Sequence, residues 1–200
     1  MRIVAGTSRG RVLAAPKSDD VIRPTADRVR ETIFNVLGQS CDAFSVLDLF
    51  AGTGALAFEA LSRGATRAVL VDTGREAHHL IRQNAEALDF TQRIELIKEP
   101  VLRALESLGR RRERFELVFS DPPYKQEAGL AVLEALDENA LVAEGGVAVV
   151  EHARQEALPE KVGRLERIDE RSFGGTTISM YRNQGPAKVD APLVDEPPPA

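Results

Sequence analysis

The chain has 200 residues, of which 43% are hydrophobic and 28% charged, as in an ordinary globular domain. It has no apolar run long enough to cross a bilayer, and its first residues lack the apolar segment of a signal peptide, so we expect a cytoplasmic protein. A single cysteine, Cys41, excludes an internal disulfide and a cysteine-based zinc site, and we expect no bound metal.

The charge is unevenly distributed along the chain. Residues 1–30 hold seven basic and three acidic side chains, a net charge of +4, so the remainder carries −9 of the total of −5. A basic segment on an acidic body can orient a polyanion toward one face, although a solvated charged segment would have the same composition.

The first 40 residues are expected to form a basic β-hairpin arm followed by a helix. Two short apolar runs, 2–5 and 11–14, flank a glycine-containing loop, which is typical of a hairpin. Thr25 can then cap a helix whose apolar residues recur at helical spacing until Gly38.

From Val46 onward, apolar runs typical of strands alternate with helical patterns. The predicted strands are 46–49, 67–72, 93–98, 115–120, 146–151, 164–171 and 176–182, and the predicted helices are 55–63, 75–88, 101–108 and 127–137. This alternation predicts an α/β fold, a mainly parallel seven-stranded sheet covered by helices, with the last two strands as an antiparallel closing pair. We expect this domain to span residues 41–182 and the proline-rich residues 183–200 to form a disordered tail.

The segment 46–54 is the first candidate site. A buried strand ends in Phe50-Ala51-Gly52-Thr53-Gly54 and a helix follows at once, an arrangement typical of a nucleotide-like ligand at the carboxyl end of a parallel strand. Asp48 would repel a pyrophosphate but suits a cationic ligand such as S-adenosylmethionine, and Asp72 could hold a ribose. Residues 52–57 also fit the dinucleotide fingerprint, and a turn without any ligand is a further alternative.

The second candidate site is Asp121-Pro122-Pro123-Tyr124, which follows the strand 115–120 and should lie at the same sheet edge. The prolines make a rigid corner that offers two acceptors, the Asp121 carboxylate and the Pro122 carbonyl. Two acceptors suit an amino group, and Tyr124 suits the face of a base. Alone, this corner could be a structural turn; with both motifs at one edge, a site for modifying an amine is favoured.

The two motifs resemble motifs I and IV of S-adenosylmethionine-dependent amino methyltransferases. The resemblance to the bacterial 16S rRNA guanine-N2 methyltransferases extends over roughly residues 1–182. It is carried by Arg2-Ile3-Val4-Ala5-Gly6, Arg23-Pro24-Thr25, Asp27-Arg28-Val29-Arg30-Glu31, Phe34-Asn35, Leu47 to Leu56 and Glu59 to Ala65.

That resemblance implies a Rossmann-like class I methyltransferase fold, S-adenosylmethionine as cofactor and 16S rRNA or a small-subunit assembly particle as partner, with a monomer expected. The cofactor residues implied are Asp48, Phe50, Ala51, Gly52, Thr53, Gly54, Asp72, Thr73, Glu99 and Pro100. The catalytic residues implied are Asp121, Pro122, Pro123 and Tyr124, and the candidate phosphate contacts are Arg9, Arg11, Arg23, Arg28 and Arg30.

The sequence departs from the family pattern at three places, the first being Ala5, where the family usually has glycine. Asp72 stands where glutamate is more usual, and Glu99-Pro100 stands where an aspartate and a small residue are typical, which puts the adenine contact there in doubt. Guanine is favoured over adenine because its N1 and N2 atoms both carry hydrogens that acceptors can hold. The alternatives are an adenine-N6 DNA methyltransferase, an NAD-dependent oxidoreductase and a non-catalytic RNA-binding module.

Overall fold

A computed structural model describes residues 1–16, 24–122 and 128–185, and for residues 24–28 it describes the backbone alone. The predicted disordered tail therefore falls almost entirely outside the described residues. The helices are α1 (Pro24–Val36), α2 (Ala55–Ser62), α3 (Arg75–Ala87), α4 (Val101–Arg110) and α5 (Gly129–Glu138), with a short 3-10 turn, η1 (Thr91–Arg93). The strands are β1 (Ser45–Leu49), β2 (Arg67–Val71), β3 (Ile94–Ile97), β4 (Phe115–Ser120), β5 (Val142–Ala153), β6 (Lys161–Val162), β7 (Leu165–Phe173) and β8 (Thr176–Asn183).

The strands form one mixed sheet in the order β3-β2-β1-β4-β5-β8-β7-β6. The first five strands pair in parallel, and β8, β7 and β6 add in antiparallel fashion, which confirms the mainly parallel sheet with an antiparallel closing pair. The described sheet has eight strands rather than seven, because the two residues of β6 pair with the start of β7 around Gly163, whose φ is +55°.

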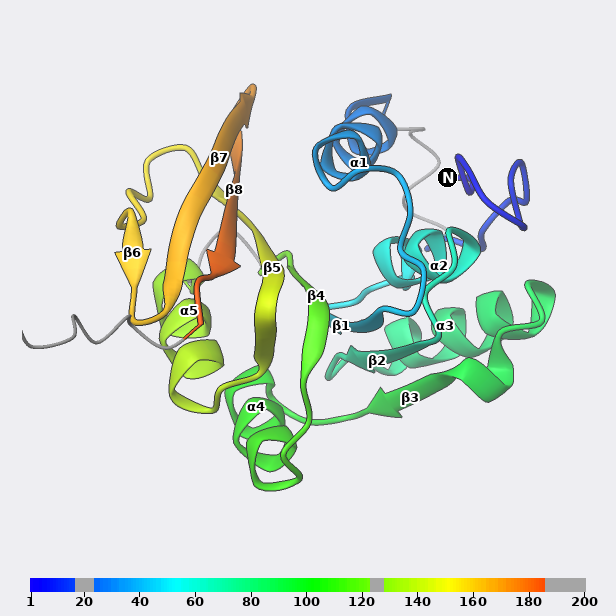
Figure 1. The fold of residues 1–200 in the computed structure, drawn as a ribbon. Coiled ribbons are helices and arrows are strands. Elements are labelled where there is room, and N and C mark those ends of the chain that lie inside the picture. The colour runs from blue at the N-terminus through cyan, green and yellow to red at the C-terminus, as the bar shows by residue number, and fades with distance from the viewer. Residues whose placement is uncertain (17–23, 123–127, 186–200) are drawn as a thin grey trace, which may run out of the picture.

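Helices cover both faces of the sheet (Figure 1). The core on one face is formed by side chains of α1, α2 and α3, such as Phe34, Phe58 and Ile81, packed against alternate sheet residues such as Leu117 and Phe119. The core on the other face joins α4 and α5 to the remaining sheet side chains. The central strand β1 is buried along Val46–Leu49, as expected for a strand covered from both sides.

The N-terminal arm, residues 1–15, is a narrow hairpin that packs against the α2 side of the domain. Arg2 and Val12 form an antiparallel bridge, the Ile3 amide donates to the Arg11 carbonyl at 2.9 Å, and the Leu13 amide donates to the Met1 carbonyl at 3.0 Å. Ile3 and Leu13 are buried in the same core as α1 and α2. The arm is therefore docked on the sheet domain along one side.

Close packing fixes where the arm lies on α2. Gly6 has a φ of +80°, and a Cβ added to it would stand 1.8 Å from the Ser62 carbonyl oxygen, so only glycine fits there.

In the described ranges, no helix combines the length and apolarity that crossing a membrane requires.

Candidate active site

The strand register brings the two sequence motifs together at the carboxyl edge of the sheet. Leu49 at the end of β1 pairs with Ser120 at the end of β4, and the Asp121 amide donates to the Leu49 carbonyl at 3.4 Å. The segment 50–54, here called the glycine turn, and Asp121 with Pro122, here called the Asp-Pro corner, therefore follow adjacent parallel strands. Pro123 and Tyr124 lie outside the described residues.

The backbone of the glycine turn is in the left-handed region at three positions. The φ angles are +59° at Phe50, +55° at Gly52 and +76° at Gly54. A Cβ added to Gly54 would lie 2.6 Å from Phe58 Cε2 and 2.9 Å from Leu70 Cδ2, so the turn leaves no room for a side chain there. Phe50 is not a glycine, and its left-handed backbone is a strained conformation of the kind that functional loops hold.

Asp72 holds the glycine turn from the neighbouring strand. Its Oδ2 accepts from the Gly52 amide at 2.9 Å, and its Oδ1 accepts from the Gly74 amide at 2.7 Å. The sequence predicted a ribose-binding role, and the structure adds a role in positioning the turn. Thr73 is exposed beside it.

Asp48 lies beneath the turn, and its side chain supports the start of α2. Only 3% of the residue is exposed, and Oδ2 accepts from the Ala57 amide at 3.1 Å. Burial raises the pKa of Asp48 to about 8, and the charges of Asp121 and Asp72 add to the rise. Without a ligand, Asp48 is therefore largely protonated at pH 7, and a cation placed next to it would favour its ionised form.

Asp121 is an exposed residue at the rim, whereas Pro122 is buried. Although the residue as a whole is exposed, neighbouring protein atoms remove part of the water around its carboxyl, which raises the pKa of Asp121 to about 7, and the negative charge of Glu151 adds to the rise. Glu151 follows Val150, which pairs with Ser120, so the two acids come from adjacent parallel strands. The corner thus carries a carboxyl group that can gain or lose a proton near neutral pH.

Glu99 and Pro100 reach the same sheet edge two strands away from β1. They follow β3, whose Ile97 pairs with Val71, and Pro100 precedes the first residue of α4. Both are exposed. The structure thus brings together, along β3, β2, β1 and β4, the predicted cofactor residues and the described part of the Asp-Pro corner.

The arginines predicted to contact RNA divide into different environments. Arg9 and Arg11 are exposed on the arm, and the Arg11 guanidinium donates to the Ala87 carbonyl. Arg23 and the Arg28 side chain lie outside the described residues. Arg30 differs from the prediction: it is 3% exposed, its Nε lies 3.5 Å from Glu59 Oε2, and Nη2 donates to the Arg2 carbonyl at 2.7 Å. Its guanidinium holds the arm and α1 together and does not face a phosphate in this conformation.

Glu59 is a structural centre that the sequence reasoning missed. It is fully buried in α2, accepts from the Val4 amide at 2.8 Å and the Ala5 amide at 3.0 Å, and pairs with Arg63 Nε at 2.8 Å. A glutamate flanked by apolar residues in the middle of a short helix was the available signal, because a buried charge needs partners.

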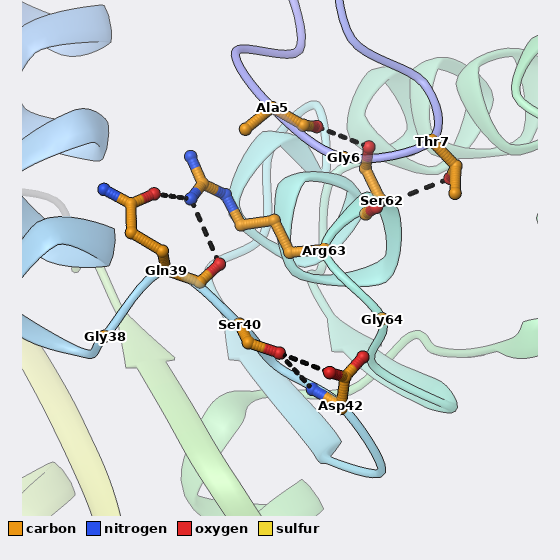
Figure 2. A pocket seen from close by; sticks show the side chains of 10 residues that line it. All are labelled: Ala5, Gly6, Thr7, Gly38, Gln39, Ser40, Asp42, Ser62, Arg63 and Gly64. Carbon is orange, nitrogen blue, oxygen red and sulfur yellow. Dashed lines mark hydrogen bonds between the residues drawn. The ribbon is translucent and has the colours of Figure 1, made fainter.

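A surface depression of about 680 Å³ opens where the arm meets the end of α2 (Figure 2). Ser62 Oγ donates to the Ala5 carbonyl at 2.6 Å, and Arg63 donates to the Gln39 carbonyl at 3.3 Å on the other side. Of the predicted site residues whose side chains the structure describes, none lines this depression. It marks the junction between the arm, the loop after α1 and α2.

Asn84 is a second residue that the sequence did not indicate. It is 1% exposed in α3, and its Nδ2 donates to the carbonyls of Thr53 at 3.0 Å and Ala14 at 3.1 Å, while its Oδ1 accepts from the Ala14 amide at 2.7 Å. It therefore connects the glycine turn to the returning strand of the arm. No local pattern distinguishes this asparagine from other polar residues of the helix.

Comparisons with known proteins agree with this geometry. The chain is 37% identical over 185 residues to the putative rRNA methyltransferase YlbH of Bacillus subtilis, covering 92% of this chain and 100% of that protein. It is 31% identical over 191 residues to the ribosomal RNA small subunit methyltransferase D of Escherichia coli, covering 96% and 94%. The solved structure of the putative methyltransferase yhhF from Escherichia coli superposes with a TM-score of 0.80 at 30% identity, covering 92% and 98%.

The model of one protein family matches residues 1–182, which includes the arm, both motifs and the closing strands. The chain belongs to the family described as Conserved hypothetical protein 95.

Proposed function

We propose that this protein transfers a methyl group from S-adenosylmethionine to the exocyclic N2 amine of a guanine in 16S rRNA. The observation that carries the proposal is the pairing of β1 with β4, which sets the glycine turn and the Asp-Pro corner side by side. The relatives of Bacillus subtilis and Escherichia coli, which carry rRNA methyltransferase names, support RNA as the substrate class.

The residues of the glycine turn fit S-adenosylmethionine better than a dinucleotide. Asp72 accepts from the Gly52 amide, so a carboxylate takes a backbone donor that the pyrophosphate of a dinucleotide would need, and buried Asp48 favours a cation over an anion beside it. We propose that Phe50 to Gly54 hold the amino-acid part, Asp72 and Thr73 the ribose, and Glu99 and Pro100 the adenine. When bound, the cofactor supplies an activated methyl group on a sulfonium.

The Asp-Pro corner would hold the nucleophile. The guanine amine is weakly nucleophilic because its lone pair is delocalised into the ring, and two acceptors that bind its hydrogens orient the amine and localise that pair. We assign these roles to the Asp121 carboxylate and the Pro122 carbonyl, with Tyr124 stacking on the base. Positioning is the main contribution of these groups. Because its pKa is raised to about 7, Asp121 can also take the proton that the amine loses.

The target base must leave its stack to reach this corner. Guanine presents hydrogens at both N1 and N2 to a carboxylate, whereas adenine presents an acceptor at N1. Exposed Arg9 and Arg11 on the arm would bind phosphates without reading the sequence. We further propose a monomer that acts in the cytoplasm on 16S rRNA or on a small-subunit assembly particle, with residues 1–40 as the RNA-binding part.

The test is to incubate the protein with labelled S-adenosylmethionine and with 16S rRNA or small-subunit particles from cells that lack the gene. Nucleoside mass spectrometry should find N2-methylguanosine as the product. N6-methyladenosine would favour the adenine alternative, and NAD binding without S-adenosylmethionine binding would favour the oxidoreductase. RNA binding without any transfer would indicate a non-catalytic module. Light scattering tests whether the protein is a monomer in solution.

A further inference from the structure

The Asn84 side chain makes hydrogen bonds to two separate regions of the molecule. Toward the arm, Asn84 binds both the amide and the carbonyl of Ala14, at 2.7 and 3.1 Å. Toward the sheet edge, Asn84 donates to the Thr53 carbonyl at 3.0 Å. Because the residue is 1% exposed, water does not replace these bonds easily, and both neighbours depend on the same amide group.

Thr53 lies between the two glycines of the glycine turn. The Gly52 amide is fixed by Asp72, and Gly54 is packed against Phe58 and Leu70. Thr53 Oγ1 also lies 3.9 Å from the sulfur of Met1, at the start of the arm. The first and the returning strand of the arm therefore both reach Thr53, the latter through Asn84.

The arm has a second attachment that does not involve the turn. Glu59 binds the amides of Val4 and Ala5, and Ser62 Oγ donates to the Ala5 carbonyl at 2.6 Å and accepts from the Ser8 amide at 2.9 Å. These contacts hold the middle of the arm on α2. The arm is thus attached to the glycine turn through Asn84 and, independently of the turn, to α2 through Glu59 and Ser62.

We propose that Asn84 is a positioning residue that couples the glycine turn to the arm, so that cofactor binding at the turn strengthens RNA binding by the arm. The inference rests on the proposed function. A ligand on the turn restricts the Thr53 carbonyl, Asn84 passes this restriction to Ala14, and the strand that carries Arg11 is ordered before RNA arrives. Binding couplings are reciprocal, so RNA tightens cofactor binding by the same factor.

The test measures amide hydrogen exchange of residues 1–15 with and without S-adenosylhomocysteine. In the wild-type protein the ligand should slow exchange of the arm by about fivefold or more, the lower end of ordinary couplings. Asn84→Asp retains an acceptor for Ala14 but loses both donated bonds, so the ligand should slow its arm by less than about twofold. If the charge added in Asn84→Asp prevents folding, Asn84→Ala replaces it as the test variant.

Ser62→Ala is the matched control, because it weakens the arm only at the α2 anchor. Its arm should exchange faster than the wild-type arm, yet S-adenosylhomocysteine should slow it by the wild-type factor. A merely structural role for Asn84 would make the two variants behave alike. The inference is overturned if S-adenosylhomocysteine leaves the exchange rate of the wild-type arm unchanged. It is also overturned if the ligand slows exchange of the Asn84→Asp arm by the wild-type factor.

RNA binding gives an independent readout. The affinity for 16S rRNA, measured with and without S-adenosylhomocysteine, should rise with the ligand in wild-type and Ser62→Ala proteins and stay unchanged in Asn84→Asp. Calorimetry in the same samples reports ligand binding itself. A coupled arm in a protein that methylates no guanine would support the inference and contradict the proposed function, so the two can fail separately.

Discussion

The glycine turn and the Asp-Pro corner follow adjacent strands but are supported in different ways. The turn is held by side chains from three elements: Asp72 binds Gly52, Asn84 binds Thr53, and Asp48 caps the helix that follows. Asp121 at the corner is an exposed residue whose pKa is raised first by loss of water around the carboxyl and then by the negative charge of Glu151. A turn braced by several side chains beside a carboxyl at the rim is the arrangement that the proposed roles, cofactor binding at the turn and substrate binding at Asp121, require.

The largest effect is expected from Asp121→Ala, which separates the two regions. Because Asp121 contributes an acceptor and no support to the turn, methyl transfer should fall by about a hundredfold or more. Affinity for S-adenosylmethionine should stay within about tenfold and the melting temperature should be nearly unchanged, as measured by single-turnover kinetics, calorimetry and thermal unfolding. Wild-type turnover in Asp121→Ala would contradict a role for this carboxylate in methyl transfer.

Gly54→Ala should instead lower both the stability of the fold and the affinity for the cofactor. Its φ of +76° and the 2.6 Å approach of the added Cβ to Phe58 strain the folded state. We expect a loss of about 1–2 kcal/mol in the free energy of unfolding together with weaker cofactor binding. Denaturant titration and calorimetry check this. A variant with normal stability and lost transfer would mean that the turn is not a rigid frame. Gly10→Ala is the matched control, since its φ of +84° is similar but its Cβ meets no atom within 4 Å.

Asp48→Asn should make stability depend less on pH. The folded pKa of about 8 lies above the ordinary value of 3.8, so the folded protein binds more protons than the unfolded chain between these values. Stability of the wild-type protein without ligand therefore falls as pH rises from about 4 to about 8. At pH 9 the variant should be more stable by at least about 1.4 kcal/mol, equivalent to one pKa unit.

Thermal unfolding at pH 5 and pH 9 measures this difference. At pH 5 the difference between the two melting temperatures should be much smaller than at pH 9, because most of the interval between the unfolded pKa of 3.8 and the folded pKa of about 8 lies above pH 5. The variant should bind S-adenosylmethionine more weakly, since it lacks the charge that a cationic ligand favours. Identical pH dependence of the two melting temperatures would contradict the burial argument.

The smallest effect on the two regions is expected from Arg9→Ala combined with Arg11→Ala. Both side chains are exposed on the arm, and Arg11 also contacts the Ala87 carbonyl. If each binds one phosphate of a single strand, the slope of log affinity for RNA against log salt should become shallower by about 1.4. Cofactor affinity should not change. An unchanged slope would remove the arm from the RNA interface.

Much of the fold and the candidate site could be predicted from local patterns. Alternating apolar runs and helical spacing determine the parallel sheet, because each strand and helix must bury one face. The topology then requires that residues after β1, β2, β3 and β4 share one edge, so Gly52, Asp72, Glu99 and Asp121 could be placed together before any coordinates. The family match over residues 1–182 agrees with those patterns.

The roles of individual charged and polar side chains were decided only by tertiary structure. Arg30 has the same local appearance as a phosphate-binding arginine, but packing of α1 against α2 buries it beside Glu59, 29 positions along the chain. Asn84 binds Thr53 and Ala14, which are 31 and 70 positions away. Burial and hydrogen bonding of a side chain depend on which distant segments of the chain pack against it. A local sequence pattern does not specify those segments.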